Sequence, residues 1–557
     1  MDRSVDEKRP SLTARARERR PLLLVVPAGL LLAAFLAYPL QGILRESFQR
    51  DGGIGLLVED TYYLERGWFT LWQATVSAAL TLLLAVPLAW LLACHAFPGK
   101  RTIEAVLMVP FVLPTIVVAV AFSALIGPSG VANDLLTRIP GIEEPPIRIL
   151  NTVWAILLAH VFYNVAVAGR IIATGWRGLD SRVEESAAML GAGPAARFFL
   201  ITLPALRNSL LAAASLVFLF CFTSFGVVLI LGGPQFGTLE TEIYRESLFL
   251  FRLPVAGALA LAQLVVTFAA IVINARLQQT TPQRTEARST TPWDRKSAAL
   301  GAAILALLLL LTAAPMAALV ERSFHGGDGY TLRYYTMLDD NVRGQALFVA
   351  PIEAVRNSVV FAIATVAVAL PIGTLAAIGS VRARSTLAEA LVQLPLGVSS
   401  VTLGLGFLVT MDQPPLNLRE SPALVVIAHS LIAVPFVTRT VSARLRSLDP
   451  RLRDAAAMLG AGPARTFFAV EAPLLKGAIG VAAVLSFATS TGEFGATLLI
   501  ARPEYPTIPV AIFRYLGQPG ALNYGQALAM STVLMAVTGS TFFLAERLVR
   551  VRTGGVS

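Results

Sequence analysis

Long apolar runs constrain this chain more than any other feature. Twelve of them follow one another, each close to the roughly 20 residues that a helix needs to cross a hydrocarbon core. Hydrophobic residues make up 55% of the chain and charged residues only 14%, so a water-soluble fold could not cover the apolar surface. We therefore expect an all-α polytopic membrane protein with about 12 transmembrane helices. The runs lie at residues 21–43, 69–94, 104–126, 151–174, 205–232, 254–275, 298–320, 357–379, 386–411, 422–438, 476–501 and 522–545.

Arginine and lysine cluster in every other loop between these runs. Such clusters stay on the cytoplasmic side of a membrane, so we expect both termini in the cytoplasm and a multi-pass protein of the bacterial plasma (inner) membrane. The first run is too long for a signal-peptide core, and we expect it to be a retained span. The net charge of +10 comes from these short clusters, which predicts the lipid bilayer as a partner and no nucleic acid.

The chain also repeats itself. Residues 187–195 read AAMLGAGPA, and residues 456–464 read AAMLGAGPA again, 269 positions later. Each copy lies between the fourth and fifth apolar runs of its half, so the two halves are parallel repeats. The sequence thus predicts two pseudo-symmetric six-helix halves. Their expected boundaries are a cytoplasmic basic tail at 1–20, a first half at 21–277, a cytoplasmic linker at 278–296 and a second half at 297–557.

The repeated loop has the pattern of a short helix, a turn and a second short helix. Ser181 and Glu184 fit a capping box that begins the first copy, and Asp449 is expected to cap the second. Gly191 and Gly460 end these helices. The product carries a partly apolar face. It docks into a groove on a partner protein or packs beneath its own membrane helices, and these residues alone leave both open.

The same loops resemble the EAA loop of binding-protein-dependent ABC importer permeases, the type I, MetI-like superfamily. The sequence departs mildly from the motif, with Ser186 for the first alanine and Asp454 for the glutamate. The resemblance implies that each loop is a coupling helix that fits a cleft in one of two copies of an ABC ATPase subunit, and that the second copy couples less tightly. The motif residues are Glu185, Ala187, Gly191 and Pro204 in the first loop, and Asp454, Ala456, Gly460 and Pro473 in the second.

Several motifs of other protein classes are absent. No Walker A sequence is present, so ATP and Mg²⁺ are expected on partner subunits and no cofactor in this chain. No catalytic motif or metal-ligand spacing occurs, which predicts a transport subunit with no catalytic or metal site and not an enzyme. The chain has no sizeable soluble domain to capture solute, so a separate extracytoplasmic solute-binding protein is implied.

Ionisable residues inside spans are candidates for the transport pathway. The clearest is Glu493, and the 269-residue offset pairs it with Ser224. Glu493 either faces the pore or satisfies a hydrogen-bond donor within the bundle. His160 and Asn164 lie one helical turn apart, where packing or interhelical hydrogen bonding is the expected role.

The fused form with two such loops resembles ferric-iron and thiamine importer permeases. Residues 221–247 look most like the thiamine type, while residues 492–527 look more like iron permeases and share a core with molybdate and sulfate permeases. We expect iron(III) as the solute, with thiamine or an oxyanion as alternatives.

Two other protein classes fit this sequence less well. An ion-coupled secondary transporter would need membrane carboxylates or broken helices in both halves, and Glu493 has no acidic counterpart. An integral membrane enzyme would need clustered polar groups near one interface, and the sequence offers none.

Overall fold

The computed structural model describes residues 20–48, 53–279, 291–293, 295–327, 329–340 and 347–553. The expected tail before residue 20 and most of the expected linker lie outside these residues. The described chain is mostly helical, and its strands form two short two-stranded ladders, which confirms the all-α fold class. The ladders are β1 (His95–Ala96) parallel to β2 (Thr291–Pro292), and β3 (His325–Gly326) antiparallel to β4 (Gly329–Tyr330).

The first half runs from the first span to the end of α16. Its helices are η1 (Arg20–Val25), α2 (Val26–Leu32), η2 (Ala33–Ala37), α3 (Tyr38–Ser47), α4 (Gly53–Glu59), α5 (Thr61–Cys94), α6 (Lys100–Val112), α7 (Thr115–Ile126), α8 (Val131–Leu136), α9 (Val153–Arg177), α10 (Ser181–Met189), α11 (Pro194–Arg197), η3 (Phe198–Thr202), α12 (Leu203–Ala205), α13 (Arg207–Phe222), α14 (Gly226–Leu231), α15 (Leu239–Leu248) and α16 (Leu253–Gln279).

The second half repeats this order of elements. Its helices are α17 (Arg295–Ser323), α18 (Arg333–Thr336), α19 (Pro351–Arg382), α20 (Thr386–Gln393), η4 (Leu394–Gly397), α21 (Ser400–Thr410), α22 (Ala423–Arg446), α23 (Arg451–Met458), α24 (Pro463–Thr466), η5 (Phe467–Glu471), α25 (Ala472–Gly492), α26 (Gly495–Ile500), α27 (Ile508–Leu516) and α28 (Ala521–Thr553).

The number of spans agrees with the sequence. Among the described residues, ten helices are long and apolar enough to cross a membrane, or up to twelve if two bent helix pairs each count as one span. The bent pairs are Pro194–Ala205 with Arg207–Phe222, at 66°, and Thr386–Gly397 with Ser400–Thr410, at 89°.

Four apolar runs that the sequence analysis treats as continuous are interrupted. Run 104–126 breaks because Leu113 precedes Pro114 and takes an extended conformation, as residues before proline do. Run 386–411 bends between η4 and α21, and runs 205–232 and 476–501 open after α13 and α25. Non-helical backbone at membrane depth is tolerated only where it is buried in protein or lines a cavity, so we expect these four breaks to lie at such places.

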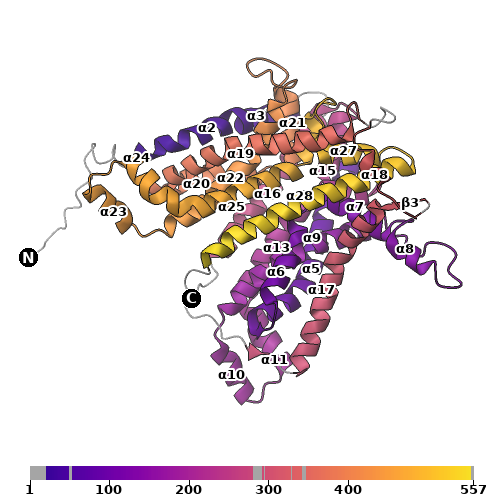
Figure 1. Ribbon diagram of the computed structural model, residues 1–557, viewed down its shortest axis with the longest axis horizontal. Coiled ribbons are helices and arrows are strands. Elements are labelled where there is room, and N and C mark those ends of the chain that lie inside the picture. Colours follow the sequence, from indigo (N-terminus) through magenta and orange to yellow (C-terminus); the bar gives the residue numbers. More distant parts are fainter. Residues whose placement is uncertain are drawn as a thin grey trace, which may run out of the picture.

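The two halves exchange their first spans. The first span (α2 and α3) packs against α19 and α21 of the second half, and α17 packs against α7 of the first half. Figure 1 shows two arms that diverge from the end where α15, α21 and α27 lie together. Each arm is therefore built from residues of both halves.

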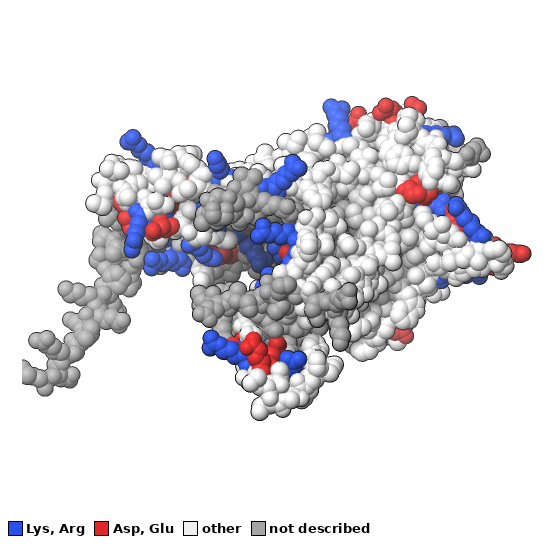
Figure 2. All heavy atoms as spheres, turned by 60° about the horizontal axis from the view of Figure 1, so that its bottom comes forward, with Lys and Arg blue, Asp and Glu red and all other residues white. Residues whose placement is uncertain are grey.

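The repeated loops lie at the free ends of the two arms, with α10 and α11 on one and α23 and α24 on the other (Figure 1). Figure 2 shows Lys and Arg side chains around the hollow between the arms, beside these loops. The loops and the basic side chains thus share one end of the molecule, and the junction of the arms forms the other.

Candidate functional site

The first repeated loop begins with an aspartate cap. The Asp180 side chain accepts a hydrogen bond from the Arg182 N–H at 3.1 Å, so α10 begins at Ser181. The expected capping box led by Ser181 is wrong, because Ser181 is already helical. Glu184 instead accepts a hydrogen bond from the hydroxyl of Thr202 at 2.7 Å, which joins α10 to η3.

The second loop is capped in the same way. The Asp449 side chain accepts a hydrogen bond from the Arg451 N–H at 2.9 Å, as predicted, and α23 begins one residue after Pro450. Asp180 and Asp449 are 269 positions apart, so the sequence repeat is also a structural repeat.

Gly191 and Gly460 end the two helices as predicted. Their φ angles are +87° and +77°, a left-handed conformation that costs other residues about 1–2 kcal/mol. In each loop the residue after the glycine donates its N–H to an alanine carbonyl of the helix, Ala187 at 2.9 Å and Ala456 at 3.0 Å. This hydrogen bond, together with the left-handed glycine, is the Schellman motif.

An apolar side-chain pair projects from the end of each helix. The exposed fractions are 88–90% for these four side chains, which are Met189, Leu190, Met458 and Leu459. Glu185 and Asp454 lie on the same two helices and are also exposed. The pairs do not pack beneath the protein's own membrane helices. Of the two alternatives left open by the sequence, the geometry favours a docking surface.

Pro204 and Pro473 both follow a π-helical turn. η3 and η5 precede them at equivalent positions, and both prolines are exposed. Proline lacks an N–H to donate to the preceding turn, and a π-helical turn is one way in which a helix accommodates such a gap. The prolines therefore shape the path from each loop into α13 or α25.

A cavity of about 350 Å³ lies between the two halves. The helix breaks that interrupt the expected spans line it, and they come from both copies of the repeat. Its lining includes Pro114, His160, Ser224, Phe225, Glu493 and Phe494. The structure thus brings together Glu493 and Ser224, the two residues that the sequence analysis paired as pathway candidates.

Histidines at equivalent positions of the repeat contact Ser224 and Glu493. His160 Nε2 lies 2.9 Å from Ser224 Oγ, and its Nδ1 lies 2.9 Å from Ser77 Oγ. His429, 269 positions after His160, places its Nε2 3.5 Å from a Glu493 carboxylate oxygen. Sequence reasoning missed this pair, although the same offset was the signal that would have found it.

Glu493 is held within the bundle as well as lining the cavity. Its carboxylate accepts hydrogen bonds from the Ala496 and Thr497 N–H groups, both at 2.9 Å, and from the Thr497 hydroxyl. Glu493 therefore caps the N-terminus of α26, and 7% of its surface is exposed. The carboxylate satisfies donors of its own chain and still borders the cavity.

Aromatic side chains close the cavity where the arms meet. Phe225 and Phe494 stack with ring centroids 5.4 Å apart. Tyr244 of α15 packs against Phe225 at 5.5 Å, and Phe513 of α27 packs against Phe494 at 5.7 Å. Tyr244 also meets its repeat counterpart Phe513, at 6.3 Å, and the four rings form what we call the aromatic junction.

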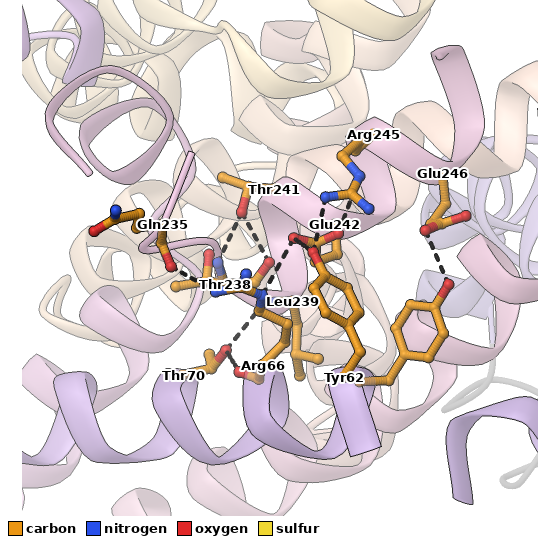
Figure 3. Close-up of polar contacts among 11 residues, drawn as sticks. Tyr62, Arg66, Thr70, Gln235, Thr238, Leu239, Thr241, Glu242, Arg245 and Glu246 are labelled. Atoms are coloured by element: carbon orange, nitrogen blue, oxygen red, sulfur yellow. Dashed lines mark hydrogen bonds and ion pairs between the residues drawn. The ribbon is translucent and has the colours of Figure 1, made fainter. Parts of the chain in front are cut away.

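A polar network fixes α15 against the start of α5 (Figure 3). The Tyr62 hydroxyl donates to Glu242 at 2.8 Å and accepts from Arg245 at 2.8 Å, while the Tyr63 hydroxyl donates to Glu246 at 2.9 Å. This network lies outside the candidate spans except for the two tyrosines. It holds Tyr244, one ring of the aromatic junction, in place.

The equivalent helices α15 and α27 differ in the charge that they bury. In both copies the first N–H of the helix donates to a hydroxyl, Leu239 to Thr70 at 3.0 Å and Ile508 to Ser358 at 2.8 Å. α15 then buries Glu240, and burial raises the pKa of this carboxyl to about 7. The three buried glutamates of α15 and their counterparts in α27 are Glu240, Glu242 and Glu246, and Pro509, Ala511 and Tyr515.

One protein-family model matches both halves of this chain. The model for the binding-protein-dependent transport system inner membrane component matches residues 85–325 and 369–552. The chain belongs to this family. It is an ABC importer permease in fused two-half form, a component of a transport system.

Curated relatives span nearly the whole permease. The thiamine transport system permease protein ThiP of Brucella abortus (strain 2308) is 28% identical over 523 residues, which cover 92% of this chain and 93% of that protein. ThiP of Escherichia coli (strain K12) is 26% identical over 489 residues, 86% of this chain and 89% of that protein. These comparisons give the expected iron(III) cargo no support and agree better with the thiamine alternative.

Two further comparisons cover about half of the permease. A putative 2-aminoethylphosphonate transport system permease protein of Salmonella choleraesuis (strain SC-B67) is 28% identical over 254 residues, 44% of this chain and 89% of that protein. A solved structure of a bacterial alginate ABC transporter with its periplasmic protein has a TM-score of 0.39 at 18% identity, covering 47% of this chain and 94% of that chain.

Proposed function

We propose that this permease forms the transmembrane pathway for thiamine. The observation that carries the proposal is the extent of the match to permeases named for thiamine transport, which covers 92% of this chain and so includes both halves and the cavity between them. The relatives share the fused architecture, so the comparison is between whole transport pathways and not between single domains.

The chemistry of the cavity agrees with such a cargo. Thiamine carries a positively charged aromatic ring, and cations of this kind are attracted to aromatic faces and carboxylates. Phe225, Phe494 and Glu493 line the cavity. Its volume of about 350 Å³ falls within the range of small-molecule sites, roughly 300–1,000 Å³.

The repeated loops supply the coupling function in this proposal. Each loop docks one copy of an ATPase subunit through its exposed apolar pair, with Gly191 and Gly460 setting the turn. The basic side chains beside the loops support a cytoplasmic location for this end of the molecule, and the proposal keeps both termini on the same side. ATP hydrolysis then belongs to the partner subunits, and an extracytoplasmic binding protein delivers solute at the junction of the arms.

Transport in cells tests the cargo directly. A strain lacking its own thiamine and ferric-iron importers would express the permease together with its ATPase and binding protein, and uptake of labelled thiamine and labelled ferric iron would be measured. We expect thiamine uptake that excess unlabelled thiamine suppresses and molybdate does not. Uptake of iron without uptake of thiamine would refute the proposal.

A further inference from the structure

The two repeated loops are joined to their π-helical turns by different chemistry. In the first loop, Thr202 donates a hydrogen bond to Glu184 at 2.7 Å. The positions 269 residues later hold Glu471 and Arg453, and the Arg453 Nε lies 2.7 Å from a Glu471 carboxylate oxygen. The same two positions pair in both copies, through a hydrogen bond in one and an ion pair in the other.

Glu471 has a second partner outside its loop. Its other carboxylate oxygen accepts a hydrogen bond from Arg382, the last residue of α19. α19 is one of the candidate membrane spans. Glu471 therefore bridges the loop helix α23 to the end of a transmembrane helix.

The burial of Glu471 makes this bridge hard to break. Only 1% of the residue is exposed, while the two arginine side chains are 21% and 31% exposed. Separating a buried carboxylate from a charged partner is costly, so the three groups hold one arrangement strongly. In the first loop the second hydrogen bond of Thr202 returns to the Arg197 carbonyl of the same loop, at 3.4 Å.

We propose that Glu471 is a positioning residue that ties the second coupling helix to α19, so that movement of the ATPase docked there is passed directly to a membrane span. This inference rests on the proposed docking of ATPase subunits on both loops. It reverses the expectation that the second copy, with Asp454 in its motif, couples less tightly.

Three variants separate the bridge from the fold. Arg382→Gln removes the link to α19 and keeps the pair between Arg453 and Glu471. The double variant Arg453→Glu with Glu471→Thr recreates in the second loop the residues of the first, and so the hydrogen bond between them. Glu389→Gln is the control, because Glu389 pairs with Arg446 in the same half without joining a loop helix to a span.

The measurement uses the complete complex in proteoliposomes with the binding protein and labelled thiamine. Copurified ATPase, ATP hydrolysis and thiamine taken up are recorded for each variant. We expect Arg382→Gln and the double variant to retain the ATPase and to hydrolyse ATP, while thiamine taken up per ATP falls roughly tenfold, within the usual range of coupling between sites. Glu389→Gln should keep the wild-type ratio.

The outcomes distinguish this inference from the proposed function. A wild-type ratio in both the Arg382→Gln and the double variant, with the ATPase bound, overturns the bridge and leaves the docking of ATPases intact. Failure of the unmodified permease to retain any ATPase overturns the proposed function itself. A double variant that does not fold leaves Arg382→Gln, whose substituted side chain is partly exposed, to decide.

Discussion

Phe225 and Phe494, which occupy the same position in the two copies of the repeat, stack on one another at an interplanar angle of 29°. Each ring lies within a helix break, between α13 and α14 or between α25 and α26. The arms diverge from this region toward the repeated loops (Figure 1). We therefore expect the aromatic junction to seal the end of the proposed pathway that lies opposite the repeated loops.

Removing the stacked rings should open the seal. With Phe225→Ala and Phe494→Ala together, we expect thiamine to leak through proteoliposomes in the absence of ATP, because the stacked pair that borders the cavity is then lost. Flux of entrapped labelled thiamine measures the leak. Phe218→Ala, which removes a ring that stacks within α13 alone, should stay tight, and a tight double variant would contradict the assignment.

The left-handed glycines should be intolerant of side chains. We expect Gly191→Val and Gly460→Val to insert into the membrane but to lose the ATPase and uptake, because a side chain at a φ of +87° or +77° costs about 1–2 kcal/mol and turns the exposed apolar pair aside. Copurification of the ATPase measures this.

The neighbouring glycines provide matched controls. Gly193 and Gly462 have φ angles of −67°, and an added side chain would meet nothing within 4 Å. Gly193→Val and Gly462→Val should therefore bind the ATPase normally. Equal losses in all four variants would show that the turn conformation is not what matters.

The equivalent histidines should differ in their contribution to stability. His160→Leu removes a hydrogen-bond partner from each of two buried hydroxyl groups, and we expect a loss of about 2 kcal/mol. His429→Leu likewise removes a partner of the Ser490 and Thr497 hydroxyls and also the neighbour of the buried Glu493 carboxylate, so we expect a larger loss, about 3 kcal/mol. Unfolding of the purified permease in mixed micelles measures both. A larger loss for His160→Leu would contradict the unequal roles.

The buried Glu240 should make stability depend on pH. Its pKa is raised from 4.5 to about 7, so the folded state holds the proton more tightly than the unfolded state does. Stability from this group is then greatest below pH 4.5 and falls as the pH rises to about 7, by on the order of 3 kcal/mol.

Replacing this carboxyl tests the pH dependence. Glu240→Gln keeps an oxygen that can accept the hydrogen bond from Gln263 and has no proton to lose. We expect the variant to be more stable than the wild type at pH 8 and to lose less stability between pH 5 and pH 8. If the free energy of unfolding changed equally in the two proteins between pH 5 and pH 8, the burial argument would be refuted.

Much of the fold could be predicted from sequence because the dominant signals are strong. The apolar runs locate the spans, and the exact repeat of residues 187–195 locates both loops and their glycine turns. The interrupted spans were missed because Pro114 and Pro395 sit inside runs whose hydropathy does not change. The exchange of first spans could not be predicted, since lipid-facing and protein-facing sides of such helices are both apolar.

The site was predicted only in part. Glu493 and Ser224 were paired by the repeat offset, and the structure places both at one cavity. The bridge through Glu471 was missed because its meaning depends on Arg382, which lies in another helix and has no fixed spacing from the loop. The motif departure at Asp454 predicted weaker coupling of the second loop to its ATPase. The contacts around Glu471 instead favour strong coupling of that loop to α19.

Reconstitution of transport tests the central claim most directly. The purified permease would be placed in proteoliposomes with its ATPase inside and its binding protein outside, and thiamine accumulation would be followed with ATP, with a non-hydrolysable analogue and with no nucleotide. The account predicts accumulation against a gradient with ATP alone, lost when Gly191 and Gly460 are both replaced by valine. Equal accumulation without nucleotide would contradict it.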